Sequence, residues 1–231
     1  MPDLSITIET RLQAVRNRIA EAATRSGRKI GDVTLLAVTK TFPFETLRAA
    51  YDAGLRDFGE NRVQEALDKI PLLPSDIRWH MIGQLQTNKI NKAIGKFVLI
   101  HSVESLHLAQ ALSQRAAAAP QDILLEVNTS GEASKSGVGL EAALSTAEAI
   151  GQLPNLRLKG LMTVGPLTED GSKVRDAFKR LKGLFEDIRG KKGIGQDISI
   201  LSMGMSGDFE AAIEEGSTLV RVGSALFGVR G

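Results

Sequence analysis

The amino-acid sequence predicts an α/β protein whose 231 residues form one (β/α)8 barrel. Three observations predict this fold: eight short apolar segments are typical of strands, segments with helical spacing separate them, and the chain length suits one large domain. A regular alternation of strands and helices implies parallel strands joined by right-handed crossovers. An open doubly wound sheet is the alternative, and it would need no eighth strand.

Most of the predicted strands are continuously apolar, as expected of parallel strands that are covered on both faces. The strands are predicted at residues 33–39, 57–60, 78–83, 97–103, 122–128, 156–164, 198–202 and 218–223. The helices are predicted to begin at Pro43 and Asn61, to span 105–118, 140–150, 174–188 and 209–215, and to end with a very short helix after Gly223.

Residues 1–26 are predicted to form an amphipathic helix that packs on the barrel. Its apolar residues recur at helical spacing, namely Leu4, Ile8, Leu12, Val15 and Ile19. We expect this helix to cover the side that the very short last helix leaves bare. The segment carries charges throughout and lacks the apolar core of a secretory signal. No linker is visible, so residues 1–231 are predicted to form a single domain.

Composition excludes several classes of function. Lys and Arg number 29 and Asp and Glu 27, without the concentrated basic face of a nucleic-acid-binding protein. The chain has no cysteine, which excludes disulfides, thiolate metal sites and cysteine nucleophiles and suits a reducing cytosol. No segment approaches the roughly 18 apolar residues of a membrane span. We therefore expect a soluble cytoplasmic protein, monomeric by default. No metal site is expected, because His101 and His107 lack metal-ligand spacing.

Two polar segments follow predicted strands, at 131–139 and 165–172, and are expected to form loops at the functional face of the barrel. The segment 190–196 precedes a strand, so a solvated turn at the opposite face is expected there. Polar residues near the carboxyl ends of the strands should meet at one mouth, since barrel active sites are built at that end. These residues are Lys40, Glu60, Asn61, His80, Asn128, Met162, Thr163, Ser202, Arg221, Gly223 and Ser224.

Simpler interpretations exist for several of these residues. His80 fits a hydrogen-bonded core histidine, Asn61 fits a helix cap, and Asn128 and Ser202 fit strand ends. Lys40 directly follows an apolar strand in AVTK. A lysine at a barrel mouth can lose solvation and become a nucleophile toward an aldehyde, or it can be an ordinary solvated lysine.

Two glycine turns late in the chain could hold a phosphate group. Residues 202–207 lead from the seventh predicted strand into a helix, and residues 221–224 lead from the eighth into a short one. Backbone N–H groups in this region of barrels often bind phosphate. Ser206 could donate its hydroxyl or cap a helix. Asp208 and Glu210 would repel a phosphate near the first turn, so the second turn is the better candidate.

Arg221 stands inside an otherwise apolar strand, where an unpaired charge is costly. Its partner should be an internal carboxylate or a ligand. An amine nucleophile, a phosphate cradle and a strand arginine together suggest a phosphorylated aldehyde. Pyridoxal phosphate fits, and so does the sugar phosphate of an aldolase.

Five blocks of sequence resemble one known family. They are GENRVQEA (59–66), WHMIGQLQTNK (79–89), VNTSGEASKSGV (127–138), LMTVGP (161–166) and LSMGMSGDFEAAIEEGSTLVRVGSALFG (201–228). They are similar to the pyridoxal phosphate homeostasis proteins, also called the YggS or PROSC family, which are single-domain relatives of the alanine racemase N-terminal barrel. The resemblance implies a (β/α)8 barrel of that type.

The resemblance also implies that pyridoxal 5′-phosphate (PLP) is held as a covalent aldimine with Lys40. Gly223, Ser224 and Ser206 would contact the phosphate, and Arg221 would face the ring nitrogen or reach the phosphate. An arginine near that nitrogen keeps it unprotonated, which makes the ring a poorer electron sink. The full implied cofactor-binding set is Lys40, Asn61, His80, Asn128, Met162, Ser202, Ser206, Arg221, Gly223 and Ser224. Lys135, in the loop SKSG, could compete for the aldehyde.

The family resemblance favours a carrier that takes part in PLP homeostasis, with PLP-dependent apo-enzymes as candidate recipients, over an enzyme. A PLP-dependent amino-acid racemase is the alternative. Two-base racemisation needs an acid–base group on each face of the substrate, and racemases of this barrel type take the second from a tyrosine on a partner's extra domain. The single tyrosine here, Tyr51, lies in a predicted helix away from the mouth.

Overall fold

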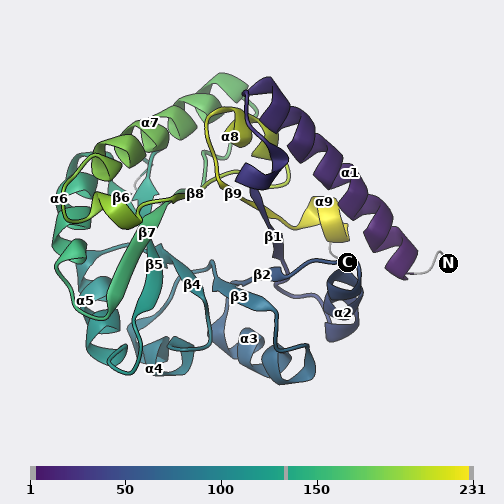
Figure 1. The fold of residues 1–231 in the computed structure, drawn as a ribbon, viewed down its shortest axis with the longest axis horizontal. Coiled ribbons are helices and arrows are strands. Elements are labelled where there is room, and N and C mark those ends of the chain that lie inside the picture. Colours follow the sequence, from purple (N-terminus) through teal and green to yellow (C-terminus); the bar gives the residue numbers. More distant parts are fainter. Residues whose placement is uncertain (1–3, 133–134, 229–231) are drawn as a thin grey trace.

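Eight parallel strands close into a barrel in the computed structural model, which describes residues 4–132 and 135–228 (Figure 1). The strands are β1 (Thr34–Val38), β2 (Asp57–Glu60), β3 (Arg78–Met81), β4 (Leu99–Val103), β5 (Gln121–Asn128), β7 (Leu156–Met162), β8 (Ile200–Ser202) and β9 (Leu219–Val222). Their order is β4-β3-β2-β1-β9-β8-β7-β5, and β4 pairs with β5. This last pairing closes the sheet, so the predicted barrel is confirmed and the open-sheet alternative is wrong.

Helices surround the barrel and connect its strands (Figure 1). They are α1 (Leu4–Arg25), α2 (Phe44–Asp52), α3 (Val63–Lys69), α4 (Ile90–Ala93), α5 (Leu106–Arg115), α6 (Leu140–Gly151), α7 (Gly171–Arg189), α8 (Phe209–Glu214) and α9 (Ser224–Phe227). Short 3-10 turns lie at Ile30–Asp32, Ile70–Leu72, Thr87–Lys89 and Gly195–Asp197.

The main hydrophobic core lies between the barrel and its helices. Alternate strand residues such as Ile100, Leu125 and Val220 are fully buried there. A second, smaller cluster contains Leu99, Leu124, Met162 and Ile200, which come from four strands at positions of the opposite parity along each strand. Because strand side chains alternate between faces, this small cluster fills the barrel interior.

Helix α1 packs along α8, α9 and α2, as Figure 1 shows. The predicted apolar stripe holds for Ile8, Leu12, Val15 and Ile19, which are buried, whereas Leu4 is exposed. Ion pairs from Arg18 and Arg25 to acidic residues of α8 add polar contacts at the edge of this interface. The helix therefore covers the side of the barrel next to the four-residue α9, as expected.

Several segments differ from the prediction. The region 84–96 had no predicted helix but contains α4, which is too short to show helical periodicity. The two-residue strand β6 (Val138–Gly139) lies in a predicted loop and pairs with β5. The helix predicted at 105–118 ends at Arg115. The turn at 190–196 is only partly solvated, because Ile194 is buried beneath it.

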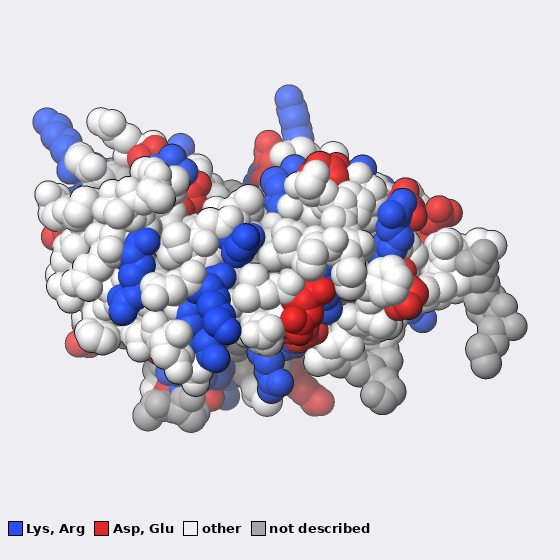
Figure 2. Space-filling model, turned by 90° about the horizontal axis from the view of Figure 1, so that it is seen from below, with Lys and Arg blue, Asp and Glu red and all other residues white. Residues whose placement is uncertain are grey.

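Figure 2 views the side of the barrel that carries α3 and α4. Basic groups lie next to one another near the centre of this face, and acidic groups lie on the same face. Within residues 4–132 and 135–228, no helix has the length and apolar character needed to cross a membrane.

Candidate functional site

A cavity of about 680 Å³ opens at the end of the barrel where the strands finish. This volume lies within the range of about 300–1,000 Å³ typical of small-molecule sites. The residues that line it are Val38, Lys40, Asn61, Ile82, Val164, Met205, Ser206, Gly207, Arg221, Gly223, Ser224 and Gly228. Six of them were predicted from the sequence, and they come together from three separate parts of the chain.

Lys40 lies two residues beyond the end of β1 and is half-buried. The turn that carries it is well defined: Phe42 N–H donates to Thr39 O at 3.2 Å, and Thr41 has a positive φ of 67°. The backbone N–H of Thr41 also donates to the carboxylate of Glu65 on α3. These contacts fix the backbone on both sides of Lys40 and place its amine at the cavity.

Arg221 enters the cavity from β9 and is 5% exposed. Its Nη1 donates to Ser202 O at 3.0 Å and to Ser202 Oγ at 2.7 Å, and Nη2 donates to Thr163 O at 2.8 Å. Burial lowers the pKa of Arg221 to about 10, opposed by the charges of Glu126 and Asp208, so it remains a cation at neutral pH. The partners predicted for it were a carboxylate or a ligand, whereas its direct partners are a hydroxyl and two carbonyls.

The side chain of Ser206 is hydrogen-bonded to the turn after β9. Its Oγ accepts hydrogen bonds from the backbone N–H of Gly223 at 3.1 Å and of Ala225 at 3.3 Å. Ser206, Gly223 and Ser224 thus lie together in the cavity lining, and the carboxylate of Glu210 pairs with Arg18. Such a group of donors suits a phosphate.

Four predicted residues lie elsewhere. His80 and Ser202 are buried in the barrel interior and are hydrogen-bonded to other side chains there. Met162 packs in the interior apolar cluster. Asn128 organises the following loop, because its side chain donates to Glu132 O at 2.9 Å and accepts from Gly131 N–H at 3.1 Å. Among the described residues, the cavity lining includes none of these four.

Apolar residues complete the cavity and were missed by the sequence analysis. Val164 and Met205 are exposed, at 42% and 38%, and flank the polar groups. Val38 and Ile82 line it too. Val164 is the last residue of the strand predicted at 156–164, and that position was the signal that could have identified it. Together these side chains offer an apolar surface to a planar ring.

Lys135, the other lysine predicted to reach an aldehyde, points elsewhere. Its Nζ lies 3.1 Å from Gly165 O and 3.0 Å from Glu132 Oε1. Residues 133–134 of its loop lie outside the described residues. In this arrangement the amine of Lys40, rather than that of Lys135, belongs to the cavity wall.

Glu126 is a buried carboxyl group on β5, close enough to Arg221 for their charges to interact. Burial raises its pKa to about 7; the charge of Glu104 adds to the rise and that of Arg221 opposes it. Its Oε2 is one of two buried side-chain oxygens without a hydrogen bond among the residues that the structure describes. No feature of the sequence distinguished Glu126 from an ordinary strand residue.

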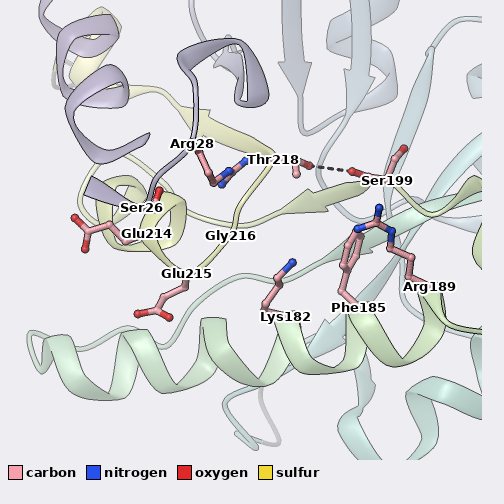
Figure 3. A pocket seen from close by; sticks show the side chains of 10 residues that line it. All are labelled: Ser26, Arg28, Lys182, Phe185, Arg189, Ser199, Glu214, Glu215, Gly216 and Thr218. Carbon is pink, nitrogen blue, oxygen red and sulfur yellow. Dashed lines mark hydrogen bonds between the residues drawn. The ribbon is translucent and has the colours of Figure 1, made fainter. Parts of the chain in front are cut away.

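A second cleft, of about 440 Å³, opens at the opposite end of the barrel, where β8 and β9 begin (Figure 3). Figure 3 shows the carboxylates of Glu214 and Glu215 pointing away from Lys182. Both pair with Arg175, and Lys182 pairs with Glu186. Because its charges are already matched, we assign this cleft to packing between helices rather than to ligand binding. Nor do three His, Asp or Glu side chains gather at any potential metal site within the described part of the chain.

The lining residues fit PLP. Lys40 offers an amine for the aldehyde, Ser206 and Ser224 offer hydroxyl donors for a dianionic phosphate, and Arg221 offers a cation in the same cavity. Apolar side chains flank the space that a ring would fill. This donor set also fits other phosphorylated aldehydes.

Comparison with known proteins narrows the choice. Residues 10–231 match the family model described as alanine racemase, N-terminal domain. A pyridoxal phosphate homeostasis protein from Pseudomonas aeruginosa is 48% identical over 227 residues, which are 97% of this chain and 96% of that protein.

Solved structures agree with this match. The structure of PipY from Synechococcus elongatus with PLP bound has a TM-score of 0.83 and 34% identity, covering 96% of this chain and all of that one. An alanine racemase from Clostridium difficile has a TM-score of 0.75 at 15% identity, covering 97% of this chain but 57% of that one. At this identity the racemase shows the shared fold alone.

Proposed function

This chain belongs to the pyridoxal phosphate homeostasis proteins of the alanine racemase N-terminal domain family, and from that premise we propose that it holds PLP as an imine on Lys40 and buffers or delivers the cofactor. The observation that carries the proposal is the convergence of Lys40, Arg221 and Ser206 on one cavity. We extend to this chain the PLP binding stated for PipY.

PLP supplies an aldehyde that condenses with an amine and a ring that withdraws electrons. Condensation of the Lys40 amine with this aldehyde forms a C=N bond and releases water, and hydrolysis reverses it. Reversibility suits a protein that must release its ligand again. We expect the hydroxyls of Ser206 and Ser224 to donate to the phosphate, with Ser206 Oγ held in place by the N–H groups of Gly223 and Ala225.

Arg221 is the group that we expect to face the ring nitrogen. A guanidinium donates hydrogen bonds but accepts none, so it favours an unprotonated nitrogen. The ring then draws less electron density from a substrate carbon. This property suits storage of the cofactor better than racemisation, and it favours the carrier over the enzyme.

The racemase alternative requires a second acid–base group at the cavity. The single tyrosine of the chain, Tyr51, lies near the end of α2, at the far end of the barrel. Its hydroxyl donates to Asp76 at 2.8 Å, and the Arg56 guanidinium lies 3.9 Å from the centre of its ring. Tyr51 is therefore held away from the mouth. Deuterium incorporation at Cα of an amino acid at an enzymatic rate would instead support the racemase.

Hydride reduction tests the proposed linkage directly. Protein incubated with PLP and reduced with borohydride should carry the cofactor mass on the peptide that contains Lys40. The Lys40→Ala variant should lose both this label and the imine absorption band, whereas Lys135→Ala should keep them. A label found on Lys135 in the wild-type protein, with Lys40 unmodified, would overturn the assignment.

The cellular part of the proposal is that the protein acts as a monomer in the cytoplasm and passes PLP to PLP-dependent apo-enzymes. Mixing the PLP-loaded protein with an apo-enzyme, and following the enzyme's activity against free PLP at equal concentration, tests delivery. If the loaded protein activates the apo-enzyme no faster than free PLP does, the protein buffers PLP but does not deliver it.

A further inference from the structure

A continuous chain of hydrogen-bonded side chains crosses the barrel interior below the cavity. It begins at Arg221, whose Nη1 lies 2.7 Å from Ser202 Oγ. Ser202 Oγ lies 3.1 Å from His101 Nδ1, and His101 Nε2 lies 3.0 Å from His80 Nδ1. His80 Nε2 lies 3.1 Å from Asp57 Oδ1. We call these five residues the interior chain; they come from β9, β8, β4, β3 and β2 in turn.

The interior chain connects the two ends of the barrel. Arg221 lines the cavity at the end where the strands finish, whereas Asp57 is the first residue of β2. Asp57 in turn accepts a hydrogen bond from Arg78 Nε at 2.7 Å, on the rim at the far end. Ser202 and His101 have no exposed surface, and His80 is 5% exposed. Bulk water therefore cannot replace these hydrogen bonds, and loss of one partner leaves the next unsatisfied.

The chemistry of the two ends determines the direction of every hydrogen bond between them. A guanidinium only donates, so Ser202 Oγ accepts from Arg221. An ionised carboxylate only accepts, and the hydrogen bonds from His80 and Arg78 outweigh burial and lower the pKa of Asp57. His80 therefore donates from Nε2.

The remaining protons follow from these ends. With its proton on Nε2, a neutral His80 accepts at Nδ1 from the Nε2–H of His101. His101 then accepts at Nδ1 from the hydroxyl of Ser202. Both histidines are then neutral with the proton on Nε2, and each of their ring nitrogens and the Ser202 hydroxyl has a partner. Burial, with the charge of Arg221, holds the pKa of His101 well below its usual value, which agrees with a neutral ring.

A charged His80 is the competing arrangement. It would donate from Nδ1 to His101, which would then donate from Nδ1 to Ser202 Oγ. In the described residues Ser202 Oγ has hydrogen bonds with Arg221 and His101 only, so its own proton would then point at no acceptor. An unsatisfied buried hydroxyl costs about 1–3 kcal/mol, which favours the neutral arrangement.

Arg221 is held by this arrangement with part of its donor capacity left for a ligand. A guanidinium has five N–H donors. Two contacts from Nη1 to Ser202 and one from Nη2 to Thr163 O use three of them. Two donors remain, and Arg221 is one of the residues that line the cavity. If Ser202 turned its hydroxyl proton toward Arg221, the two donors would oppose each other and the guanidinium would have to move.

We propose that His101, His80 and Asp57 are positioning residues for the cofactor: through Ser202 they hold Arg221 in the orientation that meets the ligand, so that changes at the far end of the barrel alter PLP binding. This inference rests on the proposed function, because it is the proposed PLP site whose affinity the interior chain adjusts. Its core, the direction of the hydrogen bonds, is independent of any ligand.

Nitrogen-15 NMR of the cofactor-free protein tests that core. The chain has only three histidines, and His107→Gln removes the exposed one, leaving His80 and His101. Both rings should show one protonated nitrogen, Nε2, and one unprotonated nitrogen, Nδ1, at neutral pH. A doubly protonated His80, or a proton on Nδ1 of His101, would overturn the inference.

The coupling to the cofactor is tested by two variants with matched controls. His101→Gln and Asp57→Asn should each weaken PLP retention about tenfold, the effect of one perturbed hydrogen bond, and shift the imine absorption band. Asp122→Asn is the control for Asp57→Asn. Asp122, near the start of β5, also pairs with the arginine opposite it on the neighbouring strand, but it lies outside the interior chain. His107→Gln is the control for His101→Gln.

The outcomes separate this inference from the proposed function. Wild-type protein that takes up no PLP would end the proposed function and leave the proton positions as measured. If both variants bind PLP as tightly as the wild type does, with their folds intact by circular dichroism, the interior chain is structural only. A larger loss of affinity in His101→Leu than in His101→Gln would support positioning, since the glutamine amide can still donate and accept.

Discussion

Lys69 Nζ lies 2.8 Å from Glu60 Oε1 and 2.9 Å from the carbonyl oxygen of Thr39, the residue before Lys40. The same ammonium pairs with Glu65 at 2.6 Å, and Glu65 accepts from the backbone N–H of Thr41. One buried cation on α3 thereby ties both neighbours of Lys40 to β2 and α3. The backbone of the proposed attachment site is thus held by an ion pair that lies outside the cavity.

Replacing Lys69 by methionine should destabilise the protein by about 3–5 kcal/mol, because Glu60, with no exposed side-chain surface, would lose its cation. Burial already raises the pKa of Glu60, and the hydrogen bonds from Lys69 and Thr39 oppose that rise. Adding Glu60→Gln to Lys69→Met should recover part of the loss. Urea unfolding measures both changes. Equal midpoints for Lys69→Met and the exposed control Lys179→Met would contradict this account.

Ser206→Ala should weaken the binding of PLP but hardly alter that of pyridoxal, which lacks the phosphate. Ser206 contributes a hydroxyl to the cavity, and its Oγ accepts hydrogen bonds from the N–H groups of Gly223 and Ala225. Loss of one charge-assisted hydrogen bond corresponds to roughly a tenfold or larger change in affinity. Titration of both aldehydes by absorbance gives the ratio of their dissociation constants. A ratio unaltered from wild type, or altered equally by Ser145→Ala on α6, would place the phosphate elsewhere.

The positions of strands and of strand-end residues could be predicted because they depend on local patterns. Lys40 follows an apolar run, and Arg221 interrupts one, so both could be placed near a mouth. The contacts inside the barrel could not be predicted, because they depend on which strands become neighbours and in what register. His80 and His101 meet only because β3 pairs with β4 with His80 opposite Leu99.

The same limit explains why the prediction for Met162 was wrong. It was expected in the pocket, but it packs against Leu99 and Leu124 inside the barrel. Its depth depends on the irregular register between β5 and β7, where the pairing shifts between Ile123 and Leu124. Sequence periodicity carries no signal for such a shift. Asn128 was placed correctly at a strand end, but its amide serves the loop that follows.

Gly160→Ala should destabilise the barrel strongly. Gly160 lies at this irregularity with a φ of 155°, and an added Cβ would come 1.7 Å from the carbonyl oxygen of Ile200 on β8. Relief requires the β7–β8 pairing to separate, so we expect a loss above about 4 kcal/mol or no folded protein. Gly183→Ala is the matched control: it has open space in α7 and should stabilise by about 0.5–1 kcal/mol. Urea unfolding of the two variants should move the midpoint in opposite directions.

The buried Glu126 should make the stability of the cofactor-free protein depend on pH. Its pKa is about 7 in the folded protein, raised mainly by burial, against 4.5 for an ordinary glutamate. Between these values the folded chain keeps a proton that the unfolded chain has lost. The free energy of unfolding should therefore fall as pH rises from 4.5 to 7, by up to about 3 kcal/mol from this group.

Glu126→Gln should remove this dependence, because the amide resembles the protonated acid in shape and stays neutral. Urea unfolding at pH 5 and pH 8 should show the variant gaining stability over wild type at pH 8 and little at pH 5. Glu21→Gln, on the exposed side of α1, should leave the wild-type difference between the two pH values in place. If Glu126→Gln leaves that difference in place as well, Glu126 is ionised in the folded protein at both pH values, and Arg221 has a full carboxylate charge beside it.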